Sequence, residues 1–168
     1  MRTCVKMVTL AIMAVLLAAL GLAGPASAKE HLVMKGPKAV KAFFYFRDAD
    51  PAVALVHLQL IQKTYHDKDL AKISPQPKFV VSILGPAARL VSSQREGFTP
   101  EQGQILDQIA AQLDQMHKEG INLEICMAAV EYFKLPPDSL LPVLKKVSNG
   151  WISAIGHQAH GYALIPVP

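Results

Sequence analysis

Two short, almost uninterrupted apolar runs constrain the fold most strongly: KAVKAFFYF at residues 38–46 and KFVVSIL at residues 78–84. Runs this short and this continuous are typical of strands buried on both faces of a sheet. Residues 121–126 (INLEIC) are predicted to be a third strand, and it ends in a cysteine. We therefore expect a sheet whose two faces are both covered.

Helix-type patterns separate these runs. Asp50 followed by Pro51 is typical of a helix start, and an apolar period continues to about residue 66. The segment TPEQ at residues 99–102 predicts a capped helix, with an apolar stripe at positions 105, 106, 109, 113 and 116. Gly120 is the expected C-terminal stop. Short helices are expected at residues 87–94 and 127–134, after the second and third strands.

The remaining segments complete the alternation. The polar stretch at residues 66–78 contains two prolines and is predicted to be a loop. Beyond residue 142 we expect a short fourth strand (143–147), a turn at Asn149-Gly150, a helix (151–160) and a last strand (162–165) ended by Pro166 and Pro168. Strands that alternate with helices predict a parallel sheet in one α/β domain.

The N-terminus has the pattern of a secretory signal. Arg2 and Lys6 precede an apolar run at residues 7–23, and Ala26 and Ala28 occupy the small-residue positions of a cleavage site. A membrane anchor is the alternative, but the run is short for a span of about 20 residues and Pro25 follows it. Cys4 precedes the apolar run, so it is badly placed for lipid attachment. We expect a cleaved signal at residues 1–28 and a periplasmic domain at residues 29–168.

Cleavage also changes the charge balance. The full chain has 17 Lys and Arg against 13 Asp and Glu, a net charge of +4. Loss of Arg2 and Lys6 leaves 15 basic residues against the same 13 acids, so the mature chain carries +2. It has no basic block of the kind that binds nucleic acid. Neither a nucleic-acid partner nor a membrane segment is expected after cleavage.

Cys126 is then the single cysteine of the mature chain, in a compartment where cysteines usually pair. It ends a predicted strand and precedes a helix, and ligand sites of parallel sheets collect at the carboxyl ends of strands. The N-terminus of that helix would favour the thiolate over the thiol. The alternative is an inert, buried cysteine that packs as a small apolar residue.

Three other side chains have more ordinary interpretations. Glu124 shares a strand face with Asn122 and Cys126, and we expect it to be exposed or paired with a lysine rather than to tune the thiol. His157 and His160 are three residues apart on one helix face. Two ligands leave a metal shell mostly unfilled, so no metal site is expected there. No phosphate-binding or dinucleotide glycine motif and no CxxC is present, and no cofactor is expected.

The stretch after Cys126 resembles the C-terminal half of the DsrE/DsrF-like family. In that family, a cysteine after the third strand is followed by a D-LLP segment, a valine-rich strand, a glycine-containing helix start and a closing GYAYI-P. Here these correspond to residues 138–142, residues 143–147, Gly150 onward and residues 161–166. The aromatic strand at residues 42–46 and the strand-GP-helix at residues 79–91 also fit, so the resemblance covers about residues 39–166.

The resemblance implies a three-layer α/β/α domain with a five-stranded, mainly parallel sheet that assembles into homotrimers or hexamers. It also implies sulfur relay, with Cys126 holding sulfane sulfur as a persulfide that it exchanges with a donor or acceptor protein or a small sulfur compound. Cys126 alone inherits a chemical role. Two features depart from the family pattern: the export signal, and the histidines His157 and His160 in the helix before GYALIP.

Three functions follow from these observations. The first is an exported sulfur carrier or sulfurtransferase-like protein that acts through Cys126. The second is a non-catalytic, oligomeric binding or assembly module with a buried structural cysteine. The third is a metal or redox sensor that uses Cys126 with His157 and His160.

Overall fold

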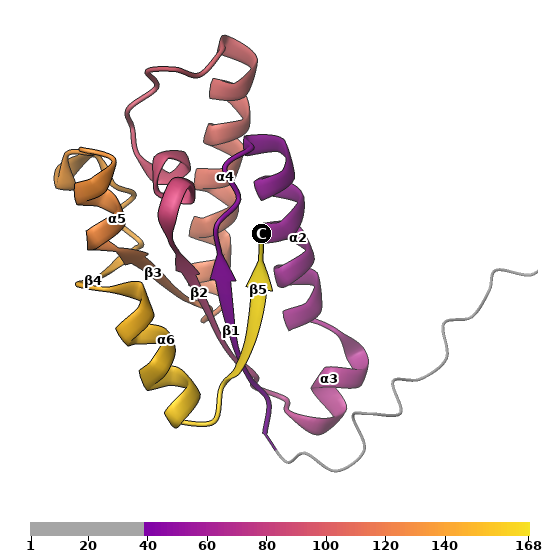
Figure 1. Cartoon of the computed structure of the whole chain (residues 1–168). Helices are drawn as coiled ribbons and strands as arrows, with labels where there is room; N and C mark the ends of the chain where they lie inside the picture. Colours follow the sequence, from indigo (N-terminus) through magenta and orange to yellow (C-terminus); the bar gives the residue numbers. More distant parts are fainter. Residues whose placement is uncertain (1–38) are drawn as a thin grey trace, which may run out of the picture. The chain divides into compact units, whose positions relative to one another are not determined.

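The computed structural model describes residues 39–168, so the predicted signal at residues 1–28 lies outside the described part. The described residues form one parallel sheet of five strands: β1 (Lys41–Phe46), β2 (Lys78–Ile83), β3 (Asn122–Cys126), β4 (Lys145–Val147) and β5 (Ala163–Val167). The strand order is β4-β3-β2-β1-β5. The chain thus adds strands from β1 outward to β4, and then crosses back to place β5 beside β1 (Figure 1).

Helices cover both faces of this sheet, as the three-layer prediction requires. Helices α2 (Pro51–Tyr65) and α4 (Pro100–Lys118) pack together on one face, and α6 (Gly150–Ala159) lies on the other (Figure 1). Strand alternation divides β1 between them: Ala42, Phe44 and Phe46 belong to the larger core, and Phe43 packs with Ala154 of α6. Residues 42–46 of β1 are buried or partly buried on both faces of the sheet, which is why they are all apolar or aromatic.

Capping residues set the helix boundaries, as predicted. The Asp50 carboxylate accepts hydrogen bonds from the backbone N–H groups of Ala52 and Val53, at 2.9 and 3.0 Å. Thr99 and Gln102 form a reciprocal capping box at the start of α4. Gly120 follows that helix with φ of +96°, a conformation that glycine adopts without strain. The shorter helical elements include two 3₁₀ helices, η2 (Gly85–Val91) and η3 (Pro137–Ser139), and the α-helix α5 (Met127–Tyr132).

The prediction of a loop at residues 66–78 is wrong for the first half of this segment. A helix, α3 (Lys68–Ile73), occupies it, with Asp67 as its N-cap. The Asp67 carboxylate accepts from the N–H groups of Asp69 and Leu70, at 2.9 and 3.1 Å, and the Leu70 side chain is buried. The two prolines follow this helix rather than interrupt it, so they limit its length without preventing it.

Two predictions near the C-terminus also need correction. Asn149-Gly150 is not a separate turn: the Asn149 side chain accepts from the Trp151 N–H at 2.8 Å and caps α6, which begins at Gly150. Pro166 does not end the last strand, because β5 continues to Val167 and Pro166 aligns with Tyr45. A proline fits there since β5 is an edge strand, where a missing backbone donor breaks no ladder bond on the outer side. No helix among residues 39–168 is long and apolar enough to cross a bilayer.

Candidate functional site

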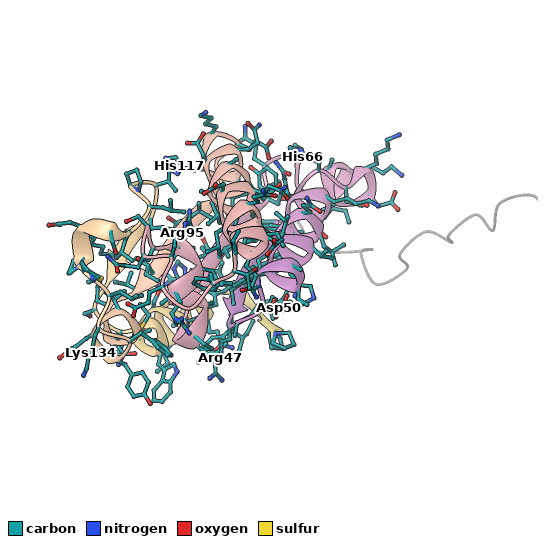
Figure 2. The ribbon with its side chains drawn as sticks, turned by 90° about the horizontal axis from the view of Figure 1, so that it is seen from above. Arg47, Asp50, His66, Arg95, His117 and Lys134 are labelled. Atoms are coloured by element: carbon teal, nitrogen blue, oxygen red, sulfur yellow. The ribbon has the colours of Figure 1, made fainter. Side chains whose placement is uncertain are left out.

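Cys126 is the last residue of β3, as the sequence predicted, and it lies at the carboxyl end of the sheet. Its side chain is free of disulfide bonds and only 6% exposed. The ends of β1 and β2 reach the same edge, since parallel strands all point one way. Figure 2 looks down on this edge and labels Arg47, the residue that directly follows β1.

The Cys126 sulfur is held by the start of a distant helix. Its Sγ accepts a hydrogen bond from the backbone N–H of Gly150 at 3.2 Å, across 24 positions of sequence. Gly150 is the first residue of the ten-residue α6, so the donor is one of the free N–H groups at the positive end of that helix. The sequence predicted this role for the helix that follows Cys126. In the structure, Cys126 precedes α5 but its side chain makes no capping hydrogen bond to it.

A glycine at position 150 makes this contact possible. A Cβ atom added there would lie 2.2 Å from Cδ2 of Leu84 and 3.2 Å from Cβ of Cys126. The first value is far inside van der Waals contact, so a side chain at position 150 would force the Leu84 side chain, α6 or both to move. The absence of a side chain therefore brings the helix N-terminus close enough to donate to the thiol sulfur.

A cavity of about 510 Å³ opens beside Cys126. It is walled by three aromatic residues, by small and apolar residues and by one charged side chain, Arg47; its lining consists of Tyr45, Arg47, Leu84, Gly85, Cys126, Ala128, Ala129, Tyr132, Asn149 and Trp151. The indole N–H of Trp151 donates to the Tyr45 hydroxyl at 2.6 Å, which ties α6 to β1 at the cavity wall. The thiol is thus buried, but it borders a space large enough for a small molecule.

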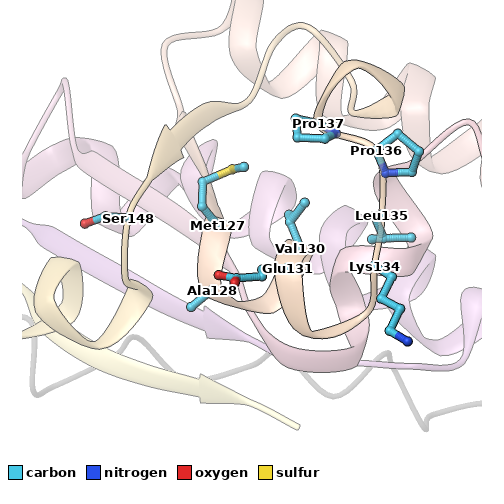
Figure 3. A pocket seen from close by; sticks show the side chains of 9 residues that line it. All are labelled: Met127, Ala128, Val130, Glu131, Lys134, Leu135, Pro136, Pro137 and Ser148. Carbon is cyan, nitrogen blue, oxygen red and sulfur yellow. The ribbon is translucent and has the colours of Figure 1, made fainter.

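A second, slightly larger cavity lies on the far side of α5, between this helix and η3 (Figure 3). Its volume is about 590 Å³, and Ala128 lines both cavities. Glu131 and Lys134 are its charged residues, and the remaining lining is mostly apolar. Because Cys126 does not line it, we place the candidate chemistry in the smaller cavity.

Glu124 is buried, which contradicts the expectation that it would be exposed or paired with a lysine. Only 2% of it is accessible, and it points to α6 rather than to solvent. Its carboxylate accepts from Ser153 Oγ at 2.5 Å, from His157 Nε2 at 3.1 Å and from Asn122 Nδ2 at 3.2 Å. Lys145 lies opposite Glu124 on β4, but the Glu124 carboxylate contacts the His157 ring rather than this lysine. The carboxylate therefore fastens the middle of α6 to the sheet.

His157 and His160 have separate partners. The His157 ring lies against Phe43 and Tyr162, with centroids 5.1 and 4.7 Å away, while it donates to Glu124. Nδ1 of His160 donates to the Gly156 carbonyl at 2.7 Å, near the C-terminus of its own helix. Within residues 39–168, no three His, Cys, Asp or Glu side chains gather in a group that could hold a metal ion.

Several site residues were missed by sequence reasoning, namely Tyr45, Arg47, Tyr132, Gly150 and Trp151. Arg47 had a usable signal, since it follows a predicted buried strand and the ends of parallel strands share one edge. Gly150 was identified only as the glycine of a helix start, because its contact with Cys126 depends on where α6 crosses the sheet.

No protein-family model and no curated protein matches the chain. Among solved structures, the protein of unknown function MTH1491 from Methanobacterium thermoautotrophicum matches with a TM-score of 0.59 at 14% identity, over 76% of this chain and 99% of that one. The ychN protein from E. coli matches with a TM-score of 0.47 at 10% identity, over 76% and 99% of the two chains. At this identity the MTH1491 likeness shows a shared fold, and the ychN likeness adds no argument.

Proposed function

We propose that this chain is an exported sulfur carrier that holds sulfane sulfur as a persulfide on Cys126. The observation that carries the proposal is the Gly150 N–H, 3.2 Å from the Cys126 sulfur, beside a cavity of about 510 Å³. A donor at a helix N-terminus stabilises negative charge on sulfur, in the thiolate and in the persulfide anion alike. The family resemblance of the sequence supports the same chemistry.

The proposed transfer needs one thiol and no change of overall oxidation state. The Cys126 thiolate attacks the outer sulfur of a donor persulfide, R–S–SH. The S–S bond of the donor breaks, the thiolate R–S⁻ leaves, and Cys126–S–SH forms. An acceptor thiolate then attacks the outer sulfur of Cys126–S–SH and returns Cys126 as a thiolate. The cavity beside Cys126 would hold the donor with its outer sulfur next to Sγ.

Substitution of Cys126 by serine tests this function. Serine retains an acceptor for the Gly150 N–H, so the variant should fold with a melting temperature close to that of the parent. After incubation with a persulfide donor, intact-protein mass spectrometry should show one added sulfur atom on the parent and none on Cys126→Ser. A parent thiol that resists alkylation until the protein unfolds, with a Cys126→Ser variant about 1–3 kcal/mol less stable, would instead indicate a structural cysteine.

Export is the part of the proposal that comes from the sequence. The small residues Ala26 and Ala28 follow a short apolar run, so signal peptidase should cleave after Ala28. N-terminal sequencing of exported protein should then begin at Lys29, and a sequence that begins at Met1 would contradict export through a cleaved signal.

An oligomeric binding module is the second candidate, and it is favoured by the outer face of α6. Trp151, Ile152 and Ile155 are 67%, 65% and 67% exposed, an unusual density of large apolar side chains on one helix. If the protein has this function, Cys126 would only fill space in the hydrophobic core and would have no chemical role. Thiol titration of the native protein separates the two candidates, since a carrier must react without unfolding.

A further inference from the structure

We infer that the Cys126 cavity binds sulfur donors that carry a carboxylate or a related oxyanion, and that Arg47 binds this group. The inference rests on the proposed function, and it specifies the class of donor. Among the described residues that line the cavity, Arg47 is the charged one and none is an acid. A cavity with one cation and a nucleophilic sulfur favours anionic molecules over neutral or cationic ones.

The position of Arg47 is set by its backbone and by a glycine. Its N–H donates to the carbonyl of Val167 at 3.0 Å, which joins the ends of β1 and β5. Its guanidinium lies beside Gly85, where an added Cβ would be 3.3 Å from Nε and 3.5 Å from Nη2. Gly85 has φ of +54°, so the turn after β2 favours glycine and leaves room for the guanidinium. Arg47 itself is exposed, and its guanidinium lies against Gly85 at the edge of the cavity.

The guanidinium has no acidic partner in the part of the chain that the structure describes. Among residues 39–168, no ion pair or side-chain hydrogen bond joins Arg47 to another residue. The neighbouring acid, Asp48, is 7% exposed and is bound instead to Nδ1 of His57 at 2.5 Å. The fork of N–H donors on Arg47 therefore remains available for a bidentate contact with a carboxylate or sulfonate.

The remaining walls indicate an organic donor. Tyr45, Tyr132 and Trp151 give the cavity an aromatic lining, and the Tyr45–Trp151 hydrogen bond holds two of these rings in place. Aromatic walls pack against the carbon chain of an organic molecule. A small thiol persulfide with a carboxylate, ⁻O₂C–R–S–SH, matches all three features of the cavity. Its carboxylate would bind Arg47, its carbon chain would pack against the aromatic wall, and its outer sulfur would meet the Cys126 thiolate. Attack by Cys126 then releases the thiolate ⁻O₂C–R–S⁻ and leaves Cys126–S–SH.

Alkylation of Cys126 in the native protein tests the preference of the cavity for anionic molecules without any sulfur transfer. Iodoacetate and iodoacetamide react with the same thiolate but differ in one carboxylate. Their rate ratio cancels any change in the thiolate fraction of Cys126. In Arg47→Gln the iodoacetate-to-iodoacetamide ratio should fall by roughly tenfold, the size of one charge-assisted hydrogen bond. Arg47→Lys should recover part of the ratio.

Arg95→Gln is the matched control. It removes the same charge from an exposed arginine that pairs with Asp107 and does not line the cavity. Its ratio should equal that of the parent protein. An iodoacetate-to-iodoacetamide ratio that is the same in parent, Arg47→Gln and Arg95→Gln would overturn the inference. An equal fall in both variants would also overturn it, because the preference for iodoacetate would then come from net charge and not from Arg47.

Sulfur loading distinguishes the donor classes. The persulfides of 3-mercaptopropionate and of 2-mercaptoethanol differ in the carboxylate. Thiosulfate tests the sulfonate, since attack of the Cys126 thiolate on its outer sulfur forms Cys126–S–S⁻ and releases sulfite. Loading of Cys126 should be faster from the carboxylate persulfide, and this advantage should disappear in Arg47→Gln. Faster loading from thiosulfate alone would identify the sulfonate as the recognised group, and equal loading from both persulfides would overturn the inference. If no donor loads Cys126 while the alkylation ratio still depends on Arg47, the sulfur-carrier function fails and the anion site stands.

Discussion

Gly150 links the packing of the protein to its proposed chemistry. It is the place where α6 meets the ends of β2 and β3, against Leu84 and Cys126. Its N–H is the donor to the Cys126 sulfur, and its missing side chain is the reason that this donor can approach to 3.2 Å. A change at Gly150 should therefore alter stability and thiol reactivity together, whereas a glycine elsewhere in α6 should affect stability alone.

Gly150→Ala should destabilise the protein by about 1–3 kcal/mol, because the new methyl group overlaps Leu84 and forces α6 outward. The same variant should change the rate at which iodoacetamide modifies Cys126, since the Gly150 N–H would move away from Sγ. Urea unfolding and alkylation kinetics measure the two effects.

Gly156→Ala is the matched control within the same helix. A Cβ atom at Gly156 meets no atom within 4 Å, and alanine is the better helix former. This variant should stabilise the protein by about 0.5–1 kcal/mol and leave the alkylation rate unchanged. Equal stability losses in the two variants would show that Gly150 is not specially constrained.

Glu119 connects the ends of the two helices on the larger core face. Its carboxylate accepts from Gln62 and His66 of the α2 end, at 2.9 and 2.8 Å, and from Gln115 of α4 at 2.8 Å. Burial raises the pKa of Glu119, but the hydrogen bonds from Gln115, Gln62 and His66 outweigh it, and the net pKa is lowered. The carboxylate is thus more acidic in the folded protein than in the unfolded chain.

This lowered pKa predicts a loss of stability in acid. A carboxyl group with a depressed folded pKa contributes its full stabilisation above its unfolded pKa of about 4.3, and loses it as the pH falls through the folded value. Glu119→Gln should therefore cost about 1 kcal/mol at pH 7 and much less at about pH 3. Urea unfolding at both pH values measures the difference. Glu131→Gln, at an exposed position of α5, is the control. The difference in unfolding free energy between this variant and the parent should be the same at both pH values.

Residues 39–168 expose large apolar side chains on two helices, α2 and α6. The outer face of α6 exposes Trp151, Ile152 and Ile155, and α6 is the helix that covers its side of the sheet. We propose that copies of the chain associate through this face, in line with the trimers or hexamers that the resemblance implies. The outer face of α2, with Val53, Val56 and Leu60 exposed, is the competing surface.

Ile155→Glu should shift the protein toward monomers in light scattering at micromolar concentration, because a charge would be buried at the interface. Val56→Glu introduces the same charge on α2, where the parent residue is 60% exposed, and should leave the assembly unchanged. The opposite result would place the interface on α2, and a monomeric parent would remove the proposed assembly.

Features that depend on neighbouring residues could be predicted from the sequence. The apolar continuity of β1 and β2, the Asp50 cap, the Thr99–Gln102 capping box and the Gly120 stop all act within a few positions of chain. The position of Cys126 at a strand end was predicted for the same reason. Even the missed helix α3 has a local signal, the Asp67 cap, which the nearby prolines obscured.

The environment of these residues was decided by the tertiary structure. Glu124 reaches Ser153 and His157 over 29 and 33 positions, and Cys126 reaches Gly150 over 24. These contacts exist because the chain returns from β4 to the far edge of the sheet and carries α6 across the face of β3 and β1. A one-dimensional pattern identifies which segments are strands and helices, but not which helix end stops beside a given thiol. That meeting depends on the order of the strands and on the glycine that lets two elements touch.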